Sequence, residues 1–248
     1  MVELSKYNRE EKPNWCPGCG NYGIITAVKK TLTELNFTPE NTVLVSGVGC
    51  FAKLPYWVKV NGFVGLHGRS LPVAQGVKLA NPKLNVIAFG GDGDGYGEGG
   101  NHFIHACRRG IDITYVVHNN SVFGLTTGQY SPTAEKGRKS KSSLLGSTEQ
   151  PINPLALAIA AGATFVARAF AGHLKETIEI LKKAVEHKGF AFVDVIQACP
   201  SYQPEKDLDY FKDKIVYVKE ESNKLNAMET ALKEDQIYCG IIYNGVKK

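Results

Sequence analysis

The sequence NVIAFGGDGDGYGEGGNHFIHACRRGIDITYVVHNNSVFGLTTGQ spans Asn85 to Gln129 and shows the clearest local pattern in the chain. A short apolar segment leads through a glycine-rich turn and a helical segment to a second apolar segment and a second polar turn. The apolar segments, Val86 to Phe89 and Ile113 to Val117, are predicted to be neighbouring parallel strands, joined by a helix that starts near Glu98. We therefore expect an α/β fold in which a mostly parallel sheet has helices on both faces.

Both predicted strands are followed by groups that suit a divalent metal ion and a phosphate. The first is followed by GGDGDG at residues 90–95 and the second by HNN at residues 118–120. Open α/β sheets bind ligands at this edge, and Mg²⁺ takes carboxylate and amide oxygens together with phosphate and water. Gly-Asp-Gly alone is typical of an ordinary turn. Its pairing with Asn120, 28 residues after Asp92, resembles the diphosphate motif of thiamine-dependent enzymes.

Length and composition favour a single domain over residues 1–248, since a chain with 43% hydrophobic residues can bury a large core. A net charge of +5, without a basic tract interleaved with aromatic residues, makes nucleic acid an unexpected partner. A basic face for an acidic protein partner remains possible. No apolar run approaches the roughly 20 residues that span a bilayer, and the N-terminus is polar. We expect a cytoplasmic protein with no membrane contact.

The remaining elements are predicted from hydrophobic spacing. Residues 130–150, rich in Lys, Ser and Gly, are expected to form a long loop that acts as a lid or binding segment or is disordered. Residues 53–64 are consistent with either a short helix or a hairpin, and the tail from about residue 201 is expected to wrap around the domain. Helices are predicted at 22–35, from 71, at 154–162, 174–187 and 223–233, and strands at 43–46, 164–168 and 190–196.

The six cysteines fall into two groups by context. Cys107 lies in a helical pattern and Cys239 in an apolar stretch, where a free cysteine packs as a small hydrophobic residue. The other four, Cys16, Cys19, Cys50 and Cys199, lie in turns. Four such thiols fit either zinc or an iron-sulfur cluster. A cluster is favoured, because it can accept electrons beside thiamine diphosphate whereas zinc has no redox role.

Six segments, in one order, resemble the β subunit of the 2-oxoacid:ferredoxin oxidoreductases over about residues 14–200. They are WCPGCG at 15–20, GVGC at 47–50, LHGR at 66–69, GDGD at 91–94, NNSVFGLTTGQ at 119–129 and ACP at 198–200. The resemblance implies a thiamine diphosphate-binding domain preceded by an N-terminal CPGC segment that holds a cluster. It also implies oxidative decarboxylation of a 2-oxo acid with CoA to acyl-CoA and CO₂, with ferredoxin as the electron acceptor.

Site residues follow from the same resemblance. A [4Fe-4S] cluster is expected on Cys16, Cys19, Cys50 and Cys199, and Mg²⁺ on Asp92, Asn120 and the carbonyl of Val122. His67 and Lys53 are the expected catalytic residues. Thiamine diphosphate is expected to contact Val48, Gly49, Cys50, Phe51, His67, Gly93, Asp94, Gly124 and Leu125.

The chain has room for only one cofactor-binding domain, so the carboxylate that activates the aminopyrimidine ring is expected on an α subunit. The chain is then active only in an αβ assembly or a dimer of αβ. The WCPGCG segment is closer to the 2-oxoglutarate or broad 2-oxoacid branch, while Thr127 leaves the substrate open. The alternatives are a non-oxidative thiamine-dependent decarboxylase or synthase subunit and a zinc-stabilised accessory subunit.

Overall fold

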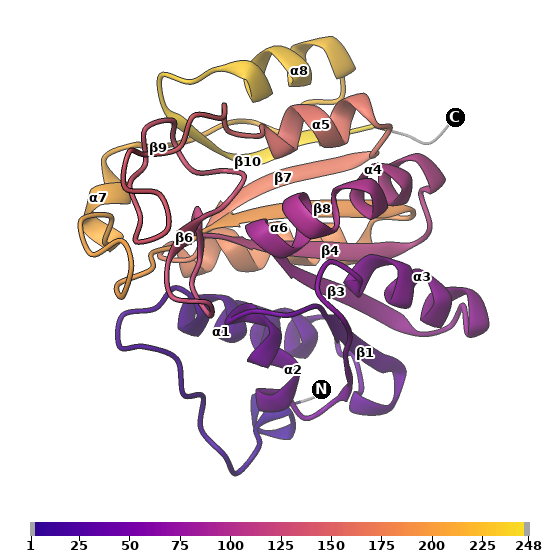
Figure 1. The fold of residues 1–248 in the computed structure, drawn as a ribbon. Helices are drawn as coiled ribbons and strands as arrows, with labels where there is room; N and C mark the ends of the chain where they lie inside the picture. The colour runs from indigo at the N-terminus through magenta and orange to yellow at the C-terminus, as the bar shows by residue number, and fades with distance from the viewer. Residues whose placement is uncertain (1–2, 246–248) are drawn as a thin grey trace.

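The computed structural model describes residues 3–245, so the predicted domain limits at residues 1 and 248 lie outside the described part. Its main sheet has eight strands and all its neighbouring strands are parallel except one pair. The strands are β1 (Thr42–Ser46), β2 (Asn61–Val64), β3 (Asn85–Gly91), β4 (Ile113–Asn119), β7 (Phe165–Phe170), β8 (Phe190–Ile196), β9 (Ile215–Tyr217) and β10 (Ile237–Asn244). Their order is β2-β1-β3-β4-β8-β7-β10-β9, with β7 and β10 antiparallel (Figure 1).

Helices cover both faces of this sheet, so the predicted fold class is confirmed. One face is covered by α1 (Asn21–Glu34), α2 (Leu54–Trp57) and α6 (Leu174–Glu186). The other face is covered by α3 (Ser70–Ala80), α4 (Gly100–Arg109), α5 (Pro154–Ala160) and α8 (Lys224–Leu232), while the short α7 (Leu208–Lys212) lies in the C-terminal part. None of the helices within residues 3–245 is long and apolar enough to cross a membrane.

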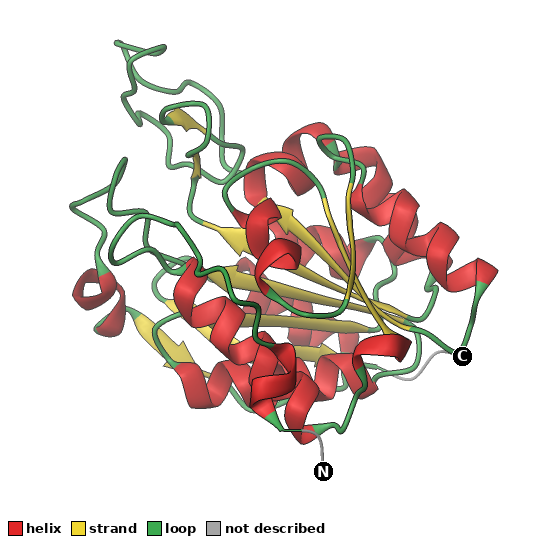
Figure 2. Ribbon diagram, turned by 90° about the horizontal axis from the view of Figure 1, so that it is seen from below, coloured by secondary structure: helices red, strands yellow, loops and turns green. Residues whose placement is uncertain are grey.

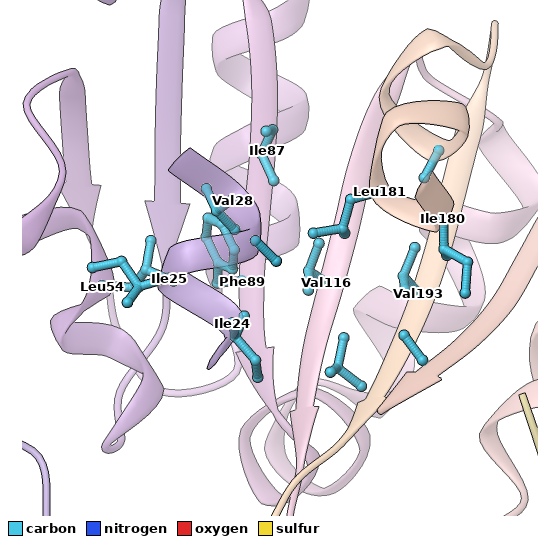
Figure 3. Close-up of a cluster of buried hydrophobic side chains, with 14 of the residues drawn as sticks. Ile24, Ile25, Val28, Leu54, Ile87, Phe89, Val116, Ile180, Leu181 and Val193 are labelled. Carbon is cyan, nitrogen blue, oxygen red and sulfur yellow. The ribbon is translucent and has the colours of Figure 1, made fainter. Parts of the chain in front are cut away.

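The core explains why the central strands are continuous apolar runs. In Figure 3, Ile24 and Val28 of α1 and Leu181 of α6 face side chains of the central strands, among them Phe89 and Val116. Every residue of β4 is buried, because helices cover it from both sides. Burying one such side chain contributes about 1.5–3 kcal/mol, so this packing holds the ends of the strands in fixed positions.

Strand register brings the polar turns together at one edge. Gly91 of β3 pairs with His118 of β4, and Asn119 pairs with Ile196 of β8. Asp92, Asn120 and Gln197 therefore leave the sheet side by side. Figure 2 shows loops gathered at one end of the strands. They include a small separate antiparallel hairpin made of β5 (Val122–Phe123) and β6 (Gln129–Tyr130).

Two segments in the N-terminal half of the chain, the glycine-rich turn after β3 and the stretch that contains β2, differ from the sequence prediction. Residues 93–98 form a single π-helical segment (Gly93–Glu98) instead of an open turn, and α4 begins at Gly100. Its glycines are needed for packing, since a Cβ on Gly95 would lie 2.2 Å from the Tyr115 hydroxyl. The ambiguous residues 53–64 contain the short helix α2 and the edge strand β2, and β2 pairs in parallel with β1, which excludes a local hairpin.

The C-terminal tail differs more. The predicted helix near residues 223–233 is present as α8, but β9 and β10 extend the main sheet instead of only wrapping around it. Cys239 is fully buried in β10, as its apolar context predicted. The loop at residues 131–153 contains no helix or strand, and backbone bonds between Gly137 and Ser147 and between Ser147 and Arg138 fold it back on itself.

Candidate cofactor site

A cavity of about 180 Å³ lies at the edge where β1, β3, β4 and β8 end. Every residue predicted to bind Mg²⁺ or thiamine diphosphate lines this cavity. These residues are Asp92, Asn120 and Val122, with Val48, Gly49, Cys50, Phe51, His67, Gly93, Asp94, Gly124 and Leu125. Of the four cysteines predicted to hold the cluster, Cys50 lines the cavity and Cys16, Cys19 and Cys199 do not. Of the two predicted catalytic residues, only His67 is in the wall. Lys53 ends the short turn Phe51–Lys53 and donates its Nζ to Oδ1 of Asn14 at 3.2 Å, outside the cavity wall.

Glycines make the cavity possible by letting backbone and rings approach closely. A Cβ on Gly93 would lie 2.2 Å from the ring of Phe123. A Cβ on Gly47 would lie 2.3 Å from the carboxylate of Asp94. Both glycines follow strands that end at this edge, so the GVG and GDG segments are required by the packing of the cavity wall itself.

Asp94 ties three loops together. Its Oδ1 accepts the backbone N–H of Val48 at 3.0 Å and that of Gly68 at 2.8 Å, and Nε2 of His67 lies 3.8 Å away. Burial raises the pKa of Asp94, and the two N–H donors and His67 oppose that rise. Its Oδ2 is buried without a hydrogen-bond partner, so this carboxylate can still accept a donor from a ligand in the cavity.

Asp92 is equally buried but is held by different groups. Its Oδ2 accepts the hydroxyl of Ser131 and the hydroxyl of Thr133, the latter at 2.7 Å. Burial raises the pKa of Asp92 to about 6, and these two hydroxyls counteract the rise. Above that pH the carboxylate is ionised and suited to a cation. Neither hydroxyl was predicted as a site residue.

Asn120 is placed by the turn that follows β4. Its side-chain Oδ1 accepts the backbone N–H of Val122 at 3.2 Å, and its carbonyl accepts the amide of Gln203. Ser121 between them has φ of 57°, in the left-handed region that tight polar turns use. The turn thus presents both Asn120 and Val122 to the cavity.

The four predicted cluster cysteines gather beside this cavity. A Cβ on Gly124 would lie 3.5 Å from Sγ of Cys50 and 4.0 Å from Sγ of Cys199. Burial raises the pKa of Cys19 to about 12, and the neighbouring thiols of Cys199, Cys50 and Cys16 raise it further. Cys16, the most exposed of the four, accepts the hydroxyl of Ser201 at 3.0 Å.

His, Cys, Asp and Glu side chains do not by themselves form a site for a single metal ion in the part of the chain that the structure describes. Within residues 3–245, no group of three or more His, Cys, Asp or Glu side chains is placed to hold one ion. The predicted Mg²⁺ site relies on an amide and a carbonyl as well as one carboxylate. In a four-iron cluster each thiolate binds a different iron, so the thiolates lie further apart than around one ion. Both metal groups remain predictions.

Several wall residues were not identified as site residues from the sequence. His118 and Gln197 are buried and also line the cavity, together with Gly91, Phe123 and Thr126. Nδ1 of His118 lies 2.7 Å from Oδ1 of Asn21, while its Nε2 has no partner. Burial lowers the pKa of His118 to about 3, so the imidazole is neutral near pH 7. Its position at the end of an apolar strand gave no sign of this role.

Comparison with known proteins agrees with this geometry. Residues 43–195 match the profile of the thiamine pyrophosphate enzyme C-terminal TPP binding domain, and residues 199–248 match the C-terminal profile of the pyruvate ferredoxin oxidoreductase beta subunit. The chain is 42% identical over 252 residues to subunit beta of 2-oxoacid:ferredoxin oxidoreductase 2 from Aeropyrum pernix, covering 96% of this chain and 82% of that protein. The chain belongs to the β subunits of the 2-oxoacid:ferredoxin oxidoreductases.

Other members of this β-subunit family support the assignment. A 2-oxoglutarate synthase subunit KorB from Methanocaldococcus jannaschii is 40% identical, with 95% of this chain and 88% of that protein covered. A solved structure of 2-oxoglutarate:ferredoxin oxidoreductase from Magnetococcus marinus, with 2-oxoglutarate, coenzyme A and succinyl-CoA bound, superimposes with a TM-score of 0.96 at 37% identity. That alignment covers 100% of this chain and 86% of the other. The family predicted from the sequence segments is confirmed.

Proposed function

We propose that this β subunit binds thiamine diphosphate and Mg²⁺ in the cavity and carries one [4Fe-4S] cluster beside it. Together with an α subunit it oxidatively decarboxylates a 2-oxo acid and transfers the acyl group to CoA. The observation that carries the proposal is the convergence of Asp92, Asn120 and Cys50 on one cavity of a thiamine-binding fold, with the other three thiols grouped around Cys50 beside it. The reaction releases two electrons, which a cluster passes one at a time to ferredoxin. A ferredoxin partner also supports a cytoplasmic location.

The cavity residues suit the diphosphate end of the cofactor. Asp92, the amide oxygen of Asn120 and the carbonyl of Val122 would hold Mg²⁺, while the glycine-rich turn brings backbone N–H groups close to phosphate. Bound thiamine diphosphate supplies a nucleophilic carbon and an electron sink for decarboxylation. Phe51 and Phe123 enclose the site and limit access of water.

His67 is the proposed catalytic residue of this chain, because it lines the cavity and lies near Asp94. Nε2 of His67 lies 3.8 Å from Oδ1 of Asp94, which places the imidazole at the cavity wall where it can exchange a proton with a bound group. Neutral His118 presents an unpartnered Nε2 on the same wall, which can accept a hydrogen bond.

Electron transfer is served by the position of Cys50. This residue lines the cavity and also belongs to the group of four thiols, so the proposed cluster would lie directly beside the reacting cofactor. Trp15 fixes this segment by donating Nε1 to the carbonyl of Cys50 at 2.7 Å. The substrate is proposed to be 2-oxoglutarate or a range of 2-oxo acids, in line with the names of the relatives.

The test is reconstitution with the α subunit. The complex should reduce ferredoxin or a viologen dye when both a 2-oxo acid and CoA are present, and this chain alone should be inert. Electron paramagnetic resonance and metal analysis should find iron in the form of one [4Fe-4S] cluster in this chain. Zinc without iron would favour an accessory subunit, and CO₂ release without electron transfer would favour a non-oxidative enzyme. Turnover by the isolated chain would show that no α subunit is needed.

A further inference from the structure

Two hydroxyl groups from a distant segment hold one oxygen of Asp92. Ser131 and Thr133 both donate to Oδ2, and the Thr133 bond measures 2.7 Å. These residues follow the β5–β6 hairpin by one and three positions, whereas Asp92 follows β3. Both hydroxyls bond to the same oxygen, so neither of them blocks Oδ1 from a cation in the cavity that Asp92 lines.

Thr133 also links the two turns that carry the proposed Mg²⁺ ligands. Its Oγ1 lies 2.9 Å from Oδ1 of Asn119 and 3.2 Å from Oγ of Ser121, the residues on either side of Asn120. Asn119 is itself held, since its amide donates to the fully buried Asp194 at 3.0 Å. The single hydroxyl proton of Thr133 is shared between Oδ2 of Asp92 and Oδ1 of Asn119, so this side chain lies between Asp92, after β3, and the turn of Asn120, after β4.

The segment does not depend on these hydroxyls for its own conformation. The backbone N–H of Ala134 donates to the carbonyl of Ser131 at 3.0 Å, and that of Ile152 donates to the carbonyl of Pro132 at 2.8 Å. Pro132 also restricts the backbone between the two hydroxyl residues. Removing a hydroxyl should therefore leave the fold in place and alter only the support of Asp92.

We propose that Ser131 and Thr133 are positioning residues for the divalent metal ion at Asp92, with Thr133 the more important. The inference rests on the proposed function. A charge-assisted hydrogen bond fixes the carboxylate before the ion arrives, so less side-chain freedom is lost when the ion binds. Groups that orient metal ligands in this way typically change metal affinity by about 10–100-fold when removed.

The test measures the Mg²⁺ concentration needed for thiamine diphosphate binding, by calorimetry on the complex with the α subunit. Thr133→Val keeps the shape of the side chain and removes its hydroxyl, so apparent Mg²⁺ affinity should fall by about 10–100-fold. Thr133→Ser restores the hydroxyl and should bind nearly as wild type. Ser131→Ala should show a smaller loss. Thr148→Val, an exposed threonine of the same loop, is the matched control and should have no effect.

Each outcome decides between the inference and its alternatives. Wild-type Mg²⁺ affinity in Thr133→Val overturns the inference, because the hydroxyl then does not support the ion. The inference is also overturned if Thr133→Ser loses as much Mg²⁺ affinity as Thr133→Val and both variants unfold at a lower midpoint than wild type. Thr133 would then have a purely structural role. If the wild-type complex binds thiamine diphosphate without needing Mg²⁺, the proposed metal site fails, and the inference that Ser131 and Thr133 position its ligand is overturned with it.

Discussion

Asp92 and Asp94 are two positions apart and equally buried, yet they have different surroundings. Asp94 accepts backbone N–H groups from the loop after β1 and the loop before α3, so it holds these two loops together. Asp92 accepts the side-chain hydroxyls of Ser131 and Thr133, and both come from the loop that follows the hairpin. A carboxylate held by backbone is part of the fold, while one held by loop hydroxyls is free to serve a ligand. The cysteines divide in the same way, with four at the cavity and two in the core.

The largest effect is expected for Asp92→Ala and Asn120→Ala. Each should abolish thiamine diphosphate binding measured by calorimetry, because an octahedral Mg²⁺ site loses one of its few protein oxygens. The unfolding midpoint should stay close to that of wild type, since neither side chain supports the sheet. Unchanged cofactor affinity in either variant would rule out the Mg²⁺ role.

Serine replacement should separate the two groups of cysteines. Ser in place of Cys16, Cys19, Cys50 or Cys199 should lose iron or electron transfer to ferredoxin, because an alcohol is a poor substitute for a thiolate ligand. Cys107→Ser should keep its iron and lose only stability, since it places a hydroxyl in the apolar core. Iron content and ferredoxin reduction are the measurements. Full retention of both in two of the four cavity variants would disprove the assignment.

Asp94→Ala should lower stability where Asp92→Ala does not. It leaves the N–H groups of Val48 and Gly68 without their acceptor, and hydrogen bonds to a charged group contribute about 1.5–3 kcal/mol each. With two such bonds lost, we expect the free energy of unfolding to fall by about 3–6 kcal/mol in urea titration. Asp209→Ala, which removes an exposed carboxylate from α7, is the control and should change it little. Equal free energies of unfolding for Asp94→Ala and Asp209→Ala would contradict the claim that Asp94 stabilises the fold by holding the loops of Val48 and Gly68.

The change of folding stability with pH in the metal-free chain should be smaller. One part of it should come from Asp92, while the buried His118, whose pKa is lowered to about 3, contributes in the opposite sense. The pKa of Asp92 is raised in the folded state from 3.8 to about 6, so folding is favoured below pH 4 and this contribution is lost as the pH rises through 6. The loss is about 1–3 kcal/mol over that range. Asp92→Asn should remove this part of the dependence when unfolding is compared at pH 4.5 and 7. An unaltered profile in Asp92→Asn would show that another group is responsible. Mg²⁺-dependent cofactor binding should change in the opposite sense and strengthen as the pH rises through 6.

The parts of the molecule that sequence predicts are those set by local chemistry. β3, β4 and β8 are continuous apolar runs because both faces are covered, and their exits carry the diagnostic GDG and NN residues. β10 was missed because it is antiparallel, irregular between Ile241 and Tyr243, and contains Gly240 at φ 122°, a feature typical of a turn. Ser131 and Thr133 were missed because they are two of many hydroxyl residues in the loop, and only tertiary packing brings them to Asp92. Lys53 does not line the cavity and its Nζ donates to Asn14, so its catalytic role stays a prediction.

The hairpin of β5 and β6 has a consequence for how this family diversifies. It forms its own two-stranded sheet and shares no backbone ladder with the eight-stranded one, yet its tip supplies Gly124, Leu125 and Thr126 to the cavity. Substitutions at the tip can therefore accumulate without disturbing the main sheet. The left-handed Thr127 (φ 78°) and Gly128 (φ 103°) restrict the backbone of this tip more than its side chains. Substitutions in residues 124–126 should therefore change contacts with a bound ligand while the backbone pairing of the main sheet stays intact.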